Sequence, residues 1–269
     1  MASVAPGIAR ALRQSLPALA AAGLLAAAAP SPAQAPAQTV ERIRPSIVAV
    51  GTLQATRQPQ FRFHGTGFAV GDGSLVATNA HVIPRALDVG QDPEQVVVVL
   101  PAREPTERIV RRARVVASAA EQDLALLRIE GPALPPLQLG DSSRVRDGES
   151  YFFTGFPVGG ALGLIPVTHR ALIGAVTPIV LPAAQANQLD ARVIRQAQRG
   201  PFDIFQLDAV AFPGNSGSPL YDSATGEVVG VVNMTVARNT KESALPQPTG
   251  IAYAIPVRHL VELIANARP

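Results

Sequence analysis

Ser216 lies in a glycine-rich turn, within the stretch Phe212-Pro213-Gly214-Asn215-Ser216-Gly217-Ser218-Pro219-Leu220. Glycine lets the backbone bend sharply, which leaves the Ser216 hydroxyl uncrowded. The same bend directs the amides of Gly214 and Ser216 towards one point, where they could hold an oxyanion. A cluster of Gly, Asn, Ser and Pro is also typical of an ordinary surface turn. A catalytic interpretation of the serine therefore depends on partner residues elsewhere in the chain.

Two upstream segments supply residues that could activate this serine. His81 follows the apolar run 75–78 at its polar end, and Asp123 directly precedes the apolar run 124–129. An imidazole titrates near neutrality, which suits it to work as a general base. Taken singly, a His after a strand or an Asp before one is more often structural. The combination in the order His, Asp, Ser favours nucleophilic catalysis.

The chain resembles the chymotrypsin-like serine proteases over roughly residues 40–265, and most closely the HtrA/Deg type. That type carries the motifs TNxHV, DxALL and GNSGxPL, which match the segments around His81, Asp123 and Ser216. Four further matches lie in the family's order, at residues 134–142, 155–157, 206–209 and 250–256. The resemblance implies a serine-type endopeptidase.

The resemblance also implies a role for each matched residue. Ser216 would be the nucleophile, His81 the general base and Asp123 the group that fixes the imidazole tautomer. The backbone amides of Gly214 and Ser216 would form the oxyanion hole, and Gly217 would keep the turn close.

Substrate specificity is inferred from the same alignment. The residues expected to bind substrate are Val210, Asn233, Met234, Thr235 and Gly250. Val210 offers no charge to a Lys, Arg or Glu side chain, so we expect a small to medium apolar residue at P1. Glutamate specificity is not supported, because glutamyl endopeptidases carry a His at the position that Asn233 occupies.

Asn215 bears on activation. In digestive relatives this position is an Asp that pairs with a newly cut amino terminus, whereas Asn215 carries no charge. We therefore expect no activation peptide apart from a signal sequence.

Short apolar runs alternate with Gly, Pro and charged connections, which predicts an all-β fold of two chymotrypsin-like antiparallel β-barrels with a C-terminal helix. After a short helix or arm at 40–47, the expected strands of the first barrel are 47–53, 67–70, 75–78, 96–100, 113–118 and 124–129, and those of the second are 150–155, 168–178, 204–208, 219–221, 228–236 and 250–255.

The expected organisation has five parts: a signal peptide and cleavage region at 1–37, an N-terminal barrel at 38–130, a linker at 131–148, a C-terminal barrel at 149–256 and a helix at 257–269. We expect the helix to pack on the second barrel. Residues 183–199 carry apolar residues at helical spacing, and we interpret them as an insertion that shapes the substrate cleft. The chain stops soon after the terminal helix, so we expect no PDZ module of the kind that HtrA proteins carry.

The N-terminal sequence is typical of a signal peptide and predicts that the protein is exported. Arg10 and Arg13 precede an apolar stretch at 16–29, and small-residue cleavage candidates end at Ala35 and Ala37. An Ala/Pro-rich tail or an uncleaved anchor is the alternative. The chain contains no cysteine, so folding cannot depend on disulfides in an oxidising compartment. Both observations suit the bacterial periplasm, or secretion.

The composition of the chain limits the classes of molecule that we expect it to bind. Hydrophobic residues make up 47% of the chain, enough for buried cores, and the net charge is only +3, which does not argue for nucleic acid. No His pair or carboxylate cluster has metal-ligand spacing, so we predict no metal and no cofactor. The expected partner is a polypeptide substrate, with no membrane span in the mature chain.

The function that these observations favour is cleavage of peptide bonds in exported or misfolded proteins, through an acyl-enzyme on Ser216. Two alternatives stay open. One is a catalytically silent relative that binds peptides along the strand near Asn233, and the other is an esterase on the same fold.

Overall fold

The computed structural model describes residues 34–101, 109–157, 159, 163–178, 202–233 and 250–267. Most of the expected signal peptide, the insertion at 183–199 and the expected substrate-binding residues Met234 and Thr235 lie outside these ranges. The described part of the chain contains no helix long and apolar enough to cross a membrane.

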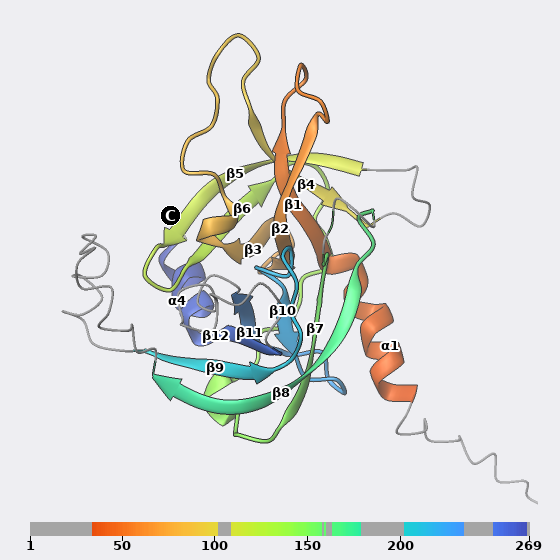
Figure 1. Ribbon diagram of the computed structural model, residues 1–269, viewed down its shortest axis with the longest axis vertical. Coiled ribbons are helices and arrows are strands. Elements are labelled where there is room, and N and C mark those ends of the chain that lie inside the picture. The colour runs from red at the N-terminus through yellow and green to blue at the C-terminus, as the bar shows by residue number, and fades with distance from the viewer. Residues whose placement is uncertain are drawn as a thin grey trace, which may run out of the picture. The chain divides into compact units, whose positions relative to one another are not determined.

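The first half of the chain forms a closed antiparallel barrel whose strands neighbour one another in the order β1-β2-β3-β6-β5-β4 (Figure 1). Its strands are β1 (Ile47–Leu53), β2 (Phe61–Val70), β3 (Leu75–Asn79), β4 (Gln95–Leu100), β5 (Ile109–Ala119) and β6 (Leu124–Ile129). They are rich in β-branched residues, which fit a pleated and half-buried surface. Closure pairs every strand on both sides, so no edge is left open.

The second half forms another closed antiparallel barrel, with the order β10-β11-β12-β9-β8-β7. Its strands are β7 (Ser150–Gly155), β8 (Val167–Pro178), β9 (Asp203–Asp208), β10 (Pro219–Tyr221), β11 (Val228–Asn233) and β12 (Ile251–Pro256). Two six-stranded barrels confirm the predicted fold class.

Three apolar clusters hold this arrangement together. One fills the first barrel and includes Val98 and Leu127, and a second fills the other barrel and includes Phe153 and Leu207. The third draws buried residues from both barrels, among them Phe68, Leu124, Tyr221 and Val231. The two barrels are therefore joined by a continuous apolar core.

In the part of the chain that the structure describes, two longer helices flank the barrels. Helix α1 (Gln34–Ile43) leads through the 3-10 helix η1 (Arg44–Ser46) into β1, and the expected helix at 40–47 thus lies further towards the N-terminus. Helix α4 (Arg258–Asn266) follows β12. It contacts β5 and β6 as well as β12, so it packs across both barrels rather than on the second alone. Its buried Leu260 and Leu263 explain this, because they belong to the shared apolar cluster.

The segment that connects the barrels is docked on both. The Leu137 amide donates to the Ala69 carbonyl of β2, and Leu139 forms a parallel bridge with Val228 of β11. The connection continues through the 3-10 helix η3 (Ser142–Arg144). It therefore adds contacts between the barrels.

Candidate active site

His81 and Asp123 meet because β3 and β6 are paired. His81 lies on the 3-10 helix η2 (Ala80–Val82), immediately after β3, and Asp123 immediately precedes β6. Asn79 and Leu124 are partners in the ladder, so the residues just beyond them lie side by side. The His81 amide donates to Asp123 Oδ1 at 2.9 Å, and His81 Nδ1 lies 2.5 Å from Asp123 Oδ2. A proton on Nδ1 satisfies the carboxylate, which leaves Nε2 as an acceptor.

Asp123 adopts a left-handed backbone conformation, with φ of 55°. This region is unfavourable for residues other than glycine, although Asp tolerates it better than most. The Asp123 carbonyl accepts hydrogen bonds from the Ala80 amide and from Asn79 Nδ2, each at 3.0 Å. Backbone and side chain of Asp123 are thus both bonded to the segment that carries His81, which offsets the unfavourable conformation.

Ser216 comes from the second barrel, in the turn before β10. Its Oγ lies 3.0 Å from His81 Nε2, on the opposite side of the imidazole from Asp123. The Ser216 residue is only 5% exposed, whereas the His81 side chain is 31% exposed. Carboxylate, imidazole and hydroxyl therefore form one hydrogen-bonded line that solvent reaches at the imidazole. Such a line allows the hydroxyl proton to move to Nε2.

The turn around Ser216 has a fixed backbone. The amides of Asn215, Gly217 and Ser218 donate to the carbonyls of Phe212, Val232 and Asn215, respectively. Gly214 has φ of 104°, and a Cβ there would lie 2.3 Å from the Phe156 carbonyl oxygen. Gly217 has φ of 88°, and a Cβ there would lie 2.0 Å from the Thr66 carbonyl oxygen. Both glycines are required by conformation and by space. The predicted oxyanion donors, the amides of Gly214 and Ser216, belong to this rigid turn.

The side chain of Asn215 is directed into the protein. It is fully buried, and neither atom of its amide finds a hydrogen-bond partner within the described part of the chain. A neutral amide is much less costly to bury in such a place than a carboxylate would be.

Asn233, one of the residues expected to bind substrate, contacts the Asp123 carboxylate. It is fully buried at the end of β11, and its Nδ2 donates to Asp123 Oδ2 at 2.9 Å. The carboxylate oxygen that faces His81 Nδ1 thus receives a second donor from the other barrel. No local sequence pattern marks this contact, because it spans 110 residues.

Val210 and Gly250 lie close to each other in the second barrel. The Ala209 amide donates to the Gly250 carbonyl at 2.9 Å, which holds the two loop ends together beside β9 and β12. Val210 is 46% exposed, so its side chain is available to a ligand.

Thr66 and Phe63 contact the serine turn, although neither is among the residues expected to form the site. Thr66 of β2 bonds to the backbone of Gly214 and of Ser216. The Phe63 ring lies against Gly214, since a Cβ built there would be 2.8 Å from it. The signal in the sequence is the Gly65-Thr66-Gly67 tripeptide, whose glycines indicate a close backbone approach.

Other histidines lie away from this site. Burial lowers the pKa of His169, which stacks on Phe153 with ring centroids 4.8 Å apart. Burial also lowers the pKa of His64, whose Nε2 lies 3.1 Å from Thr52 Oγ. Both rings therefore favour the neutral form. Among the described residues, no three His, Cys, Asp or Glu side chains gather as a metal site would need.

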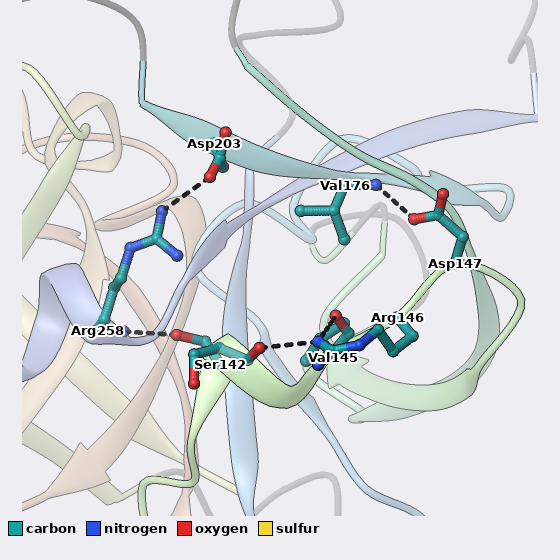
Figure 2. A pocket seen from close by; sticks show the side chains of 8 residues that line it. Ser142, Val145, Arg146, Asp147, Val176, Asp203 and Arg258 are labelled. Atoms are coloured by element: carbon teal, nitrogen blue, oxygen red, sulfur yellow. Dashed lines mark hydrogen bonds and ion pairs between the residues drawn. The ribbon is translucent and has the colours of Figure 1, made fainter.

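A hollow of about 660 Å³ lies on the second barrel, apart from His81, Asp123 and Ser216 (Figure 2). Figure 2 shows Arg258 directed at Asp203 and Asp147 directed at the Val176 amide. The first pair of groups is 3.6 Å apart and the second is 2.8 Å apart. These charged side chains of the hollow thus interact with other residues that line it. The hollow offers no aligned nucleophile and base, so the candidate active site is the Ser216 region.

The chain is similar to known serine proteases. The trypsin-like peptidase domain matches residues 65–231 of the chain. A putative serine protease HhoA from Synechocystis is 33% identical over 203 residues, which cover 75% of this chain and 42% of that protein. Mitochondrial serine protease HTRA2 of Bos taurus is 31% identical over 233 residues, covering 85% of this chain and 42% of that protein.

A probable periplasmic serine endoprotease of the DegP-like type from Pseudomonas putida is 29% identical, over 75% of this chain and 34% of that protein. The chain thus spans well under half the length of these relatives. A solved structure of the HtrA-type protease AlgW with a tripeptide superposes with a TM-score of 0.60 at 24% identity, over 88% of this chain and 63% of that chain. This likeness supports the two-barrel fold.

Proposed function

The chain belongs to the trypsin-like serine peptidases of the HtrA/DegP type, and from that premise we propose that it hydrolyses peptide bonds in polypeptides through Ser216, His81 and Asp123. One observation carries the proposal. His81 lies between the other two side chains, with Nε2 3.0 Å from Ser216 Oγ and Nδ1 2.5 Å from Asp123 Oδ2. These distances allow proton transfer without a rearrangement of the side chains.

The geometry suits acyl transfer in two steps. Ser216 Oγ attacks the carbonyl carbon of the substrate while its proton passes to His81 Nε2. Asp123 stabilises the imidazolium, and the amides of Gly214 and Ser216 hold the tetrahedral oxyanion. The imidazolium then gives its proton to the leaving amine, the C–N bond breaks, and an ester on Ser216 is left. Water, deprotonated by His81, hydrolyses this ester and restores the serine.

The proposed substrates are exported or misfolded proteins with a small to medium apolar P1 residue. Val210 supports this preference, because its exposed side chain beside Gly250 brings no charge that could pair with a charged P1 side chain. Gly250 also leaves the neighbouring space open, since a Cβ there would meet no described atom within 4 Å. The N-terminal pattern supports a location outside the cytoplasm, with removal of a signal segment ending near residue 37.

The test compares casein hydrolysis by the wild-type protein, by Ser216→Ala and by Ser143→Ala. Ser143 is an exposed serine on η3, so its loss should leave turnover unchanged. Loss of the nucleophile should reduce turnover by roughly 10⁶-fold. A fluorophosphonate should label the wild-type protein and Ser143→Ala at Ser216, and Ser216→Ala should stay unlabelled.

The same experiment separates the alternatives. A silent peptide-binding relative would bind casein peptides without cleaving them and would resist labelling. An esterase would be labelled and would hydrolyse a nitrophenyl ester, but it would leave casein intact. Either result would contradict endopeptidase activity.

A further inference from the structure

Thr66 joins the first barrel to the turn that carries the proposed nucleophile. It lies in β2 and is fully buried. Its amide donates to the Ser216 carbonyl at 2.8 Å, and its hydroxyl donates to the Gly214 carbonyl at 2.7 Å. One residue of the first barrel thus binds two carbonyls of the catalytic turn, about 150 positions along the chain.

The direction of these bonds is settled by chemistry. The Phe156 amide donates to Thr66 Oγ at 3.0 Å, and a backbone amide can only donate. The single hydroxyl hydrogen is therefore free to point at the Gly214 carbonyl, which can only accept. In addition, Thr78 Oγ donates to the Thr66 carbonyl at 2.7 Å. Thr66 is bonded at its amide, its carbonyl and its hydroxyl, so its own position is fixed.

The two carbonyls that Thr66 holds lie on either side of the Asn215–Ser216 peptide bond. Because each peptide unit is planar, holding these two carbonyls fixes the units that carry the Asn215 and Gly217 amides. The unit that carries the Ser216 amide lies between them and is therefore held at both ends. Gly214 would otherwise allow its peptide to rotate easily, since glycine accepts many backbone conformations. The hydroxyl of Thr66 removes that freedom in the Gly214–Asn215 unit, which lies between the two proposed oxyanion donors.

Close backbone approach makes these bonds possible. A Cβ at Gly217 would lie 2.0 Å from the Thr66 carbonyl oxygen, and a Cβ at Gly155 would lie 2.8 Å from Thr66 Oγ. Glycine at both positions lets three segments converge on this one threonine. The threonine hydroxyl is therefore closely surrounded by backbone.

We propose that Thr66 is a positioning residue for the oxyanion hole, with its hydroxyl fixing the Gly214–Asn215 peptide unit that lies between the Gly214 and Ser216 amides. This inference rests on the proposed peptidase function. Donors that are aimed in advance stabilise charge that develops only in the transition state. Loss of the hydroxyl should therefore lower kcat and leave KM nearly unchanged.

The experiment measures kcat and KM on a short peptide substrate for wild type, Thr66→Val and Thr66→Ser. Thr66→Val keeps the shape of the side chain and removes the hydroxyl, so kcat should fall by up to about 10²-fold. Thr66→Ser retains a hydroxyl and should return kcat close to the wild-type value.

Thr154→Val is the matched control, because Thr154 is also fully buried and its hydroxyl lies 2.8 Å from those of Thr168 and Tyr221. It should lower the free energy of unfolding without changing kcat. If Thr66→Val does not fold, Thr66→Cys replaces it, because a thiol is similar in size and only a weak donor.

Two results would overturn the inference. One is a hydroxyl-free variant with wild-type kcat, and the other is a rise in KM at constant kcat, which would indicate a role in binding. An inactive wild-type protein would overturn the proposed function together with this inference. An active wild type beside an equally active Thr66→Val would overturn this inference alone.

Discussion

The two barrels connect their strands in the same order, since β1-β2-β3-β6-β5-β4 corresponds to β7-β8-β9-β12-β11-β10. The loop after the third strand and the residue before the sixth therefore meet in both. In the first barrel, the Ala80 amide donates to the carbonyl of Asp123, which has φ of 55°. In the second, the Ala209 amide donates to the carbonyl of Gly250, which has φ of 74°.

We call this hydrogen bond, between the loop after the third strand and the residue before the sixth, the joint of each barrel. The residue that accepts it differs between the two barrels. Glycine adopts positive φ without steric cost, and Gly250 sits beside the proposed specificity residue Val210. Asp123 adopts the same conformation at a cost, and its carboxylate faces His81. Both barrels therefore keep a positive φ at this position, but the first carries a non-glycine residue there because its side chain is needed, and the second carries glycine.

The barrels also differ in how they hold the proposed catalytic groups. His81 and Asp123 are held by neighbouring strands of one barrel. The turn of Ser216 is held partly from outside its own barrel, by Thr66, while Asn233 of the second barrel reaches back to Asp123. Each barrel therefore forms hydrogen bonds to proposed catalytic residues, or to their turn, in the other barrel.

Among the tests of this comparison, the largest effect is expected from Asp123→Asn, which tests the proposed catalytic use of this contact in the first barrel. An amide cannot stabilise the imidazolium as a carboxylate does and favours the wrong tautomer of His81, so kcat should fall roughly 10⁴-fold. The measurement is kcat on a peptide substrate. Asp141→Asn is the control, because Asp141 is exposed and bonds only locally to Ser143. Wild-type activity in Asp123→Asn would exclude this residue from the mechanism.

An intermediate effect is expected for Asn233→Ala, which tests the contact from the second barrel to Asp123. A hydrogen bond to a charged group contributes about 1.5–3 kcal/mol, so kcat should fall by about 10- to 100-fold. A positioning role predicts this fall at nearly constant KM. If instead KM rises while kcat is kept, Asn233 contacts substrate, as the family alignment suggested.

The smallest expected effect is on stability and tests the joint in the second barrel. Gly250→Ala should lower the free energy of unfolding by about 1–2 kcal/mol, because an L-residue there would adopt positive φ. No described atom lies within 4 Å of the added Cβ, so the cost is conformational. Gly250→Asn is the matched variant and should cost less, since Asn tolerates this region. Urea unfolding measures both, and equal stability of Gly250→Ala and wild type would contradict the comparison.

Local sequence patterns predict the bounds of some strands well and of others poorly. The bounds of β1, β6, β7 and β10 agree with the predicted segments at both ends, because Gly, Pro and charged residues delimit their apolar runs. Strand β2 begins at Phe61, six residues before the prediction. Its first residues mix aromatic side chains with Arg62 and His64, and their pairing with β1 makes them a strand.

In the candidate active site too, some features can be predicted from the sequence and others cannot. The segments of His81, Asp123 and Ser216 can be read in the sequence, because each couples a reactive side chain to a local turn or strand end. The contacts that Thr66 and Asn233 make could not be read there. The periodicity of the chain says only that each lies in or beside a strand, and their partners are more than 100 residues away.

The sequence by itself determined the local elements of this protein and the order of its reactive residues. Apolar runs of strand length specify barrels, and glycines at tight turns specify where the backbone bends. Only the tertiary structure decided which buried polar groups meet between the barrels. Such meetings depend on how each barrel closes and on the apolar core that joins them, and no local sequence pattern encodes either.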